Sequence, residues 1–176
     1  MRRFSAQYIF TNTGSPLKRG IVNLDAEGLV TSVEDTNGDL TESASVGFYN
    51  GIIIPGFVNC HCHLELSHLR IPAENARGLA SFIKGINKLR GSEESKRIDS
   101  IIRADRMMAD EGVVLCADIC NTTDTFRIKK NSNIKYISLL EVFGANPDNA
   151  TRRMNEILQV ADRAREEGIS WWIVPH

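Results

Sequence analysis

Two histidines, His61 and His63, stand one residue apart and are the side chains of this sequence best suited to chemistry. In a β-strand alternate side chains point to the same face, so the two imidazoles would project together. Neutral imidazoles suit Zn²⁺ and Fe²⁺, and two of them on one face can hold one divalent ion. By the same alternation Cys60 and Cys62 would face the other way and pack as small apolar side chains.

Two other interpretations of this segment stay open. A pair of histidines at this spacing can arise by chance near a strand end. Alternatively, Cys60 and Cys62 could form half of a zinc knuckle that Cys116 and Cys120 complete, although free thiols are the expectation. Four cysteines at these positions are also too few and too irregular for the disulfide framework of a small secreted domain.

The residues before the histidines predict a small antiparallel unit. Short apolar strands alternate there with turns, and the polar, glycine-bearing stretch 35–45 reads as a loop. The expected strands are 4–10, 20–24 and 29–33, with a hairpin turn at 25–28.

From residue 57 onward strands and helices alternate, which predicts βαβ units and a parallel sheet. The expected strands are 57–63, 113–119, 136–143 and 170–174. The expected helices are 79–89, 94–110 and 149–167, with a short helix or loop at 122–130. The adjacent Trp171 and Trp172 would face opposite ways, and core packing explains both.

The predicted fold class is therefore α/β: the first half of a (β/α)8 TIM-type barrel at residues 56–176, after a small β-sandwich portion at residues 1–55. Four such units span about half of the roughly 250 residues of a complete barrel. The histidines would lie at the C-terminal end of the first barrel strand, where barrel enzymes keep their active sites. Because half a barrel leaves open strand edges, we expect either a completing segment or a truncated chain.

The run 55–59, Pro-Gly-Phe-Val-Asn, followed by His61, His63 and Leu64, resembles the opening signature of the amidohydrolase superfamily. Within the superfamily the likeness is to the branch of cytosine, guanine and S-adenosylhomocysteine deaminases. The strands before the motif look like the small β-sandwich that this branch builds beside its barrel. The ending at His176 resembles the start of the family's fourth-strand segment, whose histidine meets the substrate. Binuclear members of the superfamily carry a bridging carboxylated lysine on strand four. Residues 171–176 hold no lysine, so the resemblance favours the mononuclear, deaminase-like site.

Within that branch, the run 63–67, His-Leu-Glu-Leu-Ser, is similar to one in aminodeoxyfutalosine deaminases. The resemblance implies that Glu65 binds the substrate, through an amine or a base edge. Glu65 could equally pair with Arg70 or Arg77. For His68 we expect a surface position, and for two further carboxylates structural hydrogen bonding: Asp118 and Glu141.

The resemblance implies a hydrolase of non-peptide C–N bonds that deaminates a purine- or pyrimidine-type base or nucleoside with metal-activated water. It assigns His61 and His63 as metal ligands, with Zn²⁺ expected first and Fe²⁺ second. No catalytic residue is identified in this chain, because the family draws its other groups from strands five, six and eight. Zinc enzymes normally use three protein ligands, so we expect weak metal binding and no deamination by the chain alone.

The charge and hydrophobicity of the sequence favour a small-molecule substrate over nucleic acid or a membrane as the partner. With 21 basic and 22 acidic side chains the net charge is −1, which gives no electrostatic reason to bind nucleic acid. No apolar run reaches the roughly 20 residues of a membrane span, and a cytoplasmic location is expected. Two alternatives remain: a non-catalytic scaffold needing a partner half-barrel or an oligomer partner, and a hydrolase of a cyclic amide or a chlorinated ring.

Overall fold

The computed structural model describes residues 2–41, 43–69, 78, 81, 86, 94–144 and 146–175. The chain divides into two compact units, Met1–Pro55 and Gly56–His176, each with a sheet of its own. The helix predicted at 79–89 falls largely outside the described residues, as does the predicted substrate contact His176. No helix within the described part of the chain is long and apolar enough to cross a membrane.

The first unit is a curled, mainly antiparallel sheet. Its strands are β1 (Arg2–Ile9), β2 (Leu17–Lys18), β3 (Ile21–Leu24), β4 (Val30–Glu34) and β5 (Gly47–Ile53), in the order β2-β1-β3-β4. The predicted β3–β4 turn forms because Asp25 Oδ1 accepts from the Leu29 N–H at 2.8 Å while Gly28 takes a φ of +90°. β5 lies parallel to β1, which the sequence did not predict.

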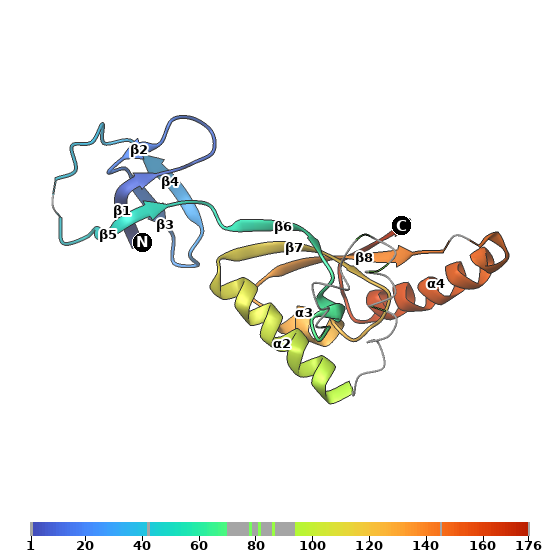
Figure 1. The fold of residues 1–176 in the computed structure, drawn as a ribbon. Coiled ribbons are helices and arrows are strands. Elements are labelled where there is room, and N and C mark those ends of the chain that lie inside the picture. Colours follow the sequence, from blue (N-terminus) through green and yellow to red (C-terminus); the bar gives the residue numbers. More distant parts are fainter. Residues whose placement is uncertain are drawn as a thin grey trace. The chain divides into compact units, whose positions relative to one another are not determined.

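The second unit contains four parallel strands in the order β6-β7-β8-β9, with helices between them (Figure 1). The strands are β6 (Phe57–Cys62), β7 (Val113–Cys120), β8 (Lys135–Val142) and β9 (Trp171–Pro175). The helices are η1 (Leu64–Leu66), α2 (Glu94–Asp110), α3 (Phe126–Asn131), η3 (Pro147–Asn149) and α4 (Ala150–Glu166). This alternation is that of the first half of a β/α barrel.

Glycines stop the two long helices where the sequence predicts. Gly112 after α2 and Gly168 after α4 take φ values of +84° and +70°, the left-handed conformation that closes a helix. The Ile169 N–H then donates to the Ala164 carbonyl at 2.9 Å and turns the chain toward β9. Each helix is thereby returned to the sheet after its last turn.

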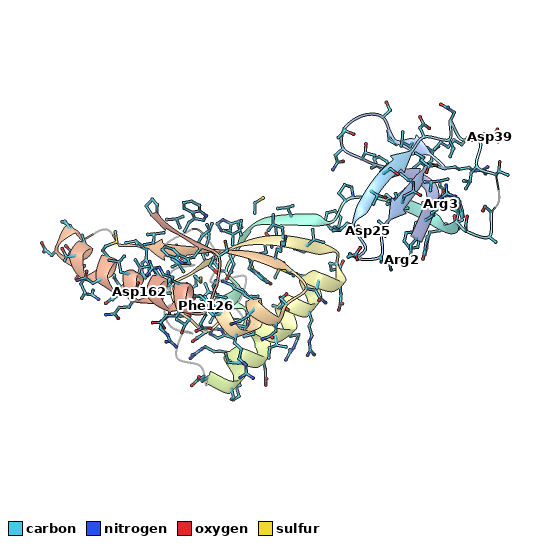
Figure 2. All side chains as sticks on the ribbon, turned by 180° about the vertical axis from the view of Figure 1, so that it is seen from behind. Arg2, Arg3, Asp25, Asp39, Phe126 and Asp162 are labelled. Atoms are coloured by element: carbon cyan, nitrogen blue, oxygen red, sulfur yellow. The ribbon has the colours of Figure 1, made fainter. Side chains whose placement is uncertain are left out.

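The core of this unit lies between one face of the sheet and the helices, which Figure 1 shows on a single side of the strands. Phe126, 1% exposed, is buried there with side chains of β7, β8 and α4 (Figure 2). Most apolar residues on the opposite face, by strand alternation, are half-buried or exposed, whereas Ile119 near the end of β7 is buried. They include Leu115, Ala117, Ile137, Leu139 and Trp172.

The two tryptophans separate across this sheet. Trp171 packs against the core, with the Arg165 guanidinium 5.7 Å from its ring centre. Trp172 is 69% exposed, so the prediction of core packing is wrong for this residue. The physical reason is that the described helices cover only the other face of β9.

Candidate functional site

His61 and His63 come together at the C-terminal end of β6. Their ring centres are 5.2 Å apart and their planes are inclined by 68°. His61 is on the strand, and the chain leaves the strand at His63, whose φ and ψ are −126° and 72°. The Asn59 side-chain oxygen accepts from the His61 N–H at 3.2 Å, which supports the backbone between them. The one-residue spacing therefore places both imidazoles on one side of the strand.

This geometry fits two ligands of one tetrahedral ion. Zinc–imidazole bonds of about 2.1 Å put the centres of two rings that share an ion roughly 5 Å apart. The observed separation matches that value. Across the residues that the structure describes, no group of three or more His, Cys, Asp or Glu side chains could hold an ion. Two imidazoles alone fall short of the three protein ligands of a usual catalytic zinc site.

The cysteines do not form the zinc knuckle considered from the sequence, because no three potential ligands gather among the residues that the structure describes. None of the four is in a disulfide. Cys62 packs toward the helices, as predicted, and its hydrogen bond with Cys116, together with burial, raises the pKa of its thiol. Cys60 is exposed, contrary to the prediction that it would be packed. Cys60 lies in the stretch of the edge strand β6 where the pairing with β7 shifts register, between Asn59 and Cys62.

Asp118 ties the end of β6 to β7. It is fully buried on the helix side of β7, and its Oδ1 accepts from the Leu64 N–H at 2.6 Å. Its Oδ2 lies 2.6 Å from the Lys129 ammonium of α3, which also donates to the Ser138 hydroxyl at 2.8 Å. The structural role predicted for Asp118 is confirmed by these contacts.

Lys129 is the residue of this network that sequence reasoning missed, because a lysine is expected on the surface. A signal did exist. Lys129 follows Phe126 by three positions, so it shares the helix face that points into the core. The side chain is only 1% exposed.

Glu65 makes a second tie one residue further on. Its Oε2 accepts from the Asn121 N–H at 3.1 Å, from the Thr122 N–H at 3.2 Å and from the Thr122 hydroxyl at 3.0 Å. Burial raises the pKa of Glu65, and these donors oppose the shift. The expected alternative partners Arg70 and Arg77 lie outside the described residues.

Glu141 continues the series on the next strand. The Asn121 side-chain amide donates to Glu141 Oε2 at 2.7 Å, which confirms the structural hydrogen bonding predicted for this carboxylate. The ends of β6, β7 and β8 are therefore connected in sequence through Glu65, Asn121 and Glu141. These contacts hold the C-terminal ends of the three strands together.

A cavity of about 320 Å³ opens beside these ties. His68 lines it, and neither ring nitrogen of this half-buried histidine has a hydrogen-bond partner among the described residues. The predicted surface position of His68 is therefore wrong. Other lining residues carry charges of both signs, among them Glu65, Arg97, Glu141, Arg153 and Glu156.

The chain matches no protein-family model and no curated protein, whereas several solved structures share its fold. Aminofutalosine deaminase of Helicobacter pylori, in complex with methylthio-coformycin, is 16% identical with a TM-score of 0.74 over 100% of this chain and 44% of its own. Guanine deaminase from C. acetobutylicum, with bound guanine, is 16% identical with a TM-score of 0.67, covering 99% of this chain and 46% of its own. Atrazine chlorohydrolase of Arthrobacter aurescens, complexed with zinc, is 16% identical with a TM-score of 0.69, covering 99% and 46%.

These similarities confirm the predicted fold class: the chain has the fold of the N-terminal part of TIM-barrel amidohydrolases. It spans slightly less than half the length of the three solved structures named above. At 16% identity the likeness concerns the fold. The chemistry has to be argued from the residues of this chain.

Proposed function

We propose that this chain supplies the first four β/α units, and two metal ligands, of a metal-dependent amidohydrolase that cleaves a non-peptide C–N bond. The observation that carries the proposal is the His61–His63 pair, with ring centres 5.2 Å apart at the C-terminal end of β6. That position is the active-site end of a β/α barrel. The proposed reaction is hydrolytic deamination of a purine- or pyrimidine-type base or nucleoside, in the cytoplasm.

In this proposal His61 and His63 hold one divalent ion, Zn²⁺ in the first place and Fe²⁺ in the second. A bound ion of this kind lowers the pKa of water and so makes a hydroxide nucleophile accessible at neutral pH. Glu65 and His176 are the proposed substrate contacts. Oε2 of Glu65 already accepts three hydrogen bonds from Asn121 and Thr122, so Oε1 is the oxygen that would contact a substrate.

The remaining ligands and proton-transfer groups are proposed to come from a second half-barrel, in the same or another polypeptide. Support comes from the face of the sheet opposite the helices, where Trp172 is 69% exposed beside half-buried apolar side chains. In a closed barrel such side chains fill the interior in layers. The structures with this fold are also more than twice the length of this chain, since it covers 44–46% of them.

Hydrolytic release of chloride from a ring is a second candidate. It is supported by the fold match to a zinc-containing atrazine chlorohydrolase, whose TM-score of 0.69 is similar to those of the deaminases. The same activated water would attack a carbon that carries chloride in place of an amine. Opening of a cyclic amide belongs to the same class of reaction.

Product release decides among these reactions. The chain alone and its complex with the completing half-barrel, loaded with Zn²⁺, are incubated with adenine-, guanine- and cytosine-type substrates and with a chlorinated triazine. Ammonia and chloride are then measured. We expect no product from the chain alone and ammonia from the complex.

The controls are variants of the complex. His61→Ala and His63→Ala should remove both the bound metal and the activity, whereas Asp162→Asn, on the exposed side of α4, should keep both. Turnover by the chain alone would overturn the proposal that it needs a second half. A folded, metal-loaded complex that releases neither ammonia nor chloride would overturn the assignment as a deaminase or a chlorohydrolase.

A further inference from the structure

We infer that Asp118, held in place by Lys129, is a positioning residue that sets the relative orientation of the His61 and His63 imidazoles. The inference rests on the proposed function, in which these imidazoles are metal ligands. It assigns a role to a carboxylate on the helix side of β7, away from the face on which the imidazoles lie. The argument depends on where the backbone of β6 loses its regular support.

The ladder between β6 and β7 is irregular where the histidines stand. Asn59 pairs with Cys116 and Cys62 with Asp118, so three steps along β6 correspond to two along β7. The chain then leaves the strand at His63 and enters η1 at Leu64. Regular strand hydrogen bonds therefore do not fix the orientation of the two imidazoles, and another constraint is required.

The bond from the Leu64 N–H to Asp118 Oδ1 supplies that constraint. At 2.6 Å it is a short, charge-assisted hydrogen bond, and it fixes the peptide that directly follows His63. Leu64 itself is 1% exposed and packs in the core with Ile101 and Cys116. The backbone on the C-terminal side of His63 is thus held by both a polar and an apolar contact.

Lys129 makes the carboxylate a rigid anchor. Its ammonium lies 2.6 Å from Asp118 Oδ2, and the two side chains are 1% and 0% exposed, so bulk water does not compete. Lys129 also donates to Ser138 on β8. The Leu64 N–H is therefore held, through Asp118 and Lys129, by contacts with three elements: β7, α3 and β8. Groups that orient metal ligands in this indirect way commonly change metal affinity when they are lost.

Asp105 offers a matched control. It is 8% exposed and also accepts two short bonds, from the Ser132 hydroxyl at 2.6 Å and the Tyr136 hydroxyl at 2.7 Å. It joins α2 to the segment around β8 and, within the described part of the chain, makes no hydrogen bond to β6. Loss of Asp105 should weaken the fold without turning the imidazoles. A difference between the Asp118 and Asp105 variants therefore separates positioning from stability.

The probe is Ni²⁺–nitrilotriacetate, whose chelator leaves two neighbouring coordination positions for imidazoles. It needs only the His61–His63 pair, so the result does not depend on ligands that the proposed enzyme takes from elsewhere. The full, untagged chain is used, with Cys60→Ser in every sample so that the exposed thiol does not compete. Calorimetry measures the dissociation constant, circular dichroism verifies folding, and His61→Ala gives the background.

Two double variants decide the question. Both contain Lys129→Met, so that the buried cation and the charge of Asp118 are removed together. With Asp118→Leu the acceptor for the Leu64 N–H is lost, and Ni²⁺–nitrilotriacetate should bind about 10- to 100-fold more weakly. With Asp118→Asn the side-chain carbonyl can still accept that hydrogen bond, and binding should return toward the unsubstituted value. Asp105→Asn should bind as the parent does.

Equal binding by the Leu and Asn double variants, or no binding above the His61→Ala background by the parent chain, would overturn the inference. If the Leu variant does not fold, Asp118→Ala with Lys129→Met makes the same comparison. A chain that binds the probe as expected, within a complex that releases neither ammonia nor chloride, would instead count against the proposed function alone.

Discussion

Removing the Lys129 ammonium should destabilise the second unit far more than removing an exposed cation. The Lys129–Asp118 pair is 2.6 Å apart with side chains 1% and 0% exposed. At that separation the attraction is roughly 6 kcal/mol for an effective dielectric constant of about 20. Burial of the two ions costs several kcal/mol each, so the intact pair contributes little net stability. Loss of one partner removes the attraction and leaves the burial cost of the other.

Lys129→Met should therefore lower the free energy of unfolding by about 3–5 kcal/mol, the usual cost of leaving one buried charge unpaired. That is a large part of the roughly 5–15 kcal/mol that stabilises a typical domain. Adding Asp118→Asn removes the stranded charge, keeps an acceptor for the Leu64 N–H and should restore most of the loss. Arg163→Met breaks an ion pair with Glu166 whose side chains are 62% and 61% exposed, and should cost at most about 1 kcal/mol.

Urea unfolding followed by circular dichroism measures the parent chain, Lys129→Met, Asp118→Asn alone, the double variant and Arg163→Met. The first four form the double-mutant cycle that gives the coupling between Asp118 and Lys129. A loss below about 1 kcal/mol for Lys129→Met would refute the reasoning, because such a value belongs to exposed ion pairs. A double variant as unstable as Lys129→Met would refute it too. The loss would then come from packing and not from the unpaired charge.

Three further outcomes follow from the same contacts. Phe126→Ala should cost about 3–5 kcal/mol in urea unfolding, since this ring is 1% exposed in the core. Burial and Asp105 raise the pKa of Tyr136 in the folded chain. The protonated phenol therefore stabilises the fold fully below the unfolded pKa of about 10, and this stabilisation falls as the pH rises above that value. Tyr136→Phe should make the alkaline fall of the melting temperature shallower. Burial raises the pKa of Cys120 to about 12, so at pH 8 a thiol reagent should modify exposed Cys60 quickly and Cys120 only after unfolding.

Elements whose signal is local could be predicted from the sequence. The bounds of α2 agree with the prediction because its buried positions recur at helical spacing and Gly112 closes it. β5 was missed because residues 47–53 contain Asn50 and Gly51, which read as a turn. That strand forms through its parallel pairing with β1, a contact between residues more than 40 positions apart.

The candidate site divides in the same way. The proximity of His61 and His63 could be predicted from their one-residue spacing, although His63 lies just past the end of β6. The ties from Asp118 to Leu64 and from Glu65 to Asn121 each cross more than 50 positions. They depend on the register between β6 and β7, including its irregularity, and nothing in the local sequence specifies that register. Composition and periodicity thus find the histidine pair but not the long-range contacts at the end of β6.

The sheet of the second unit separates stability from chemistry by face. Cys116, Asp118 and Cys120 on β7 turn toward the helices and join the two core clusters or the buried ion pair. The intervening side chains belong to the face that carries the imidazoles, and Trp172 on that face is 69% exposed. Because the core lies on the helix side, substitutions on the imidazole face should leave folding of the described unit nearly intact. The same substitutions should weaken association with the proposed second half-barrel, so that face can be varied to test the proposed function without loss of the fold.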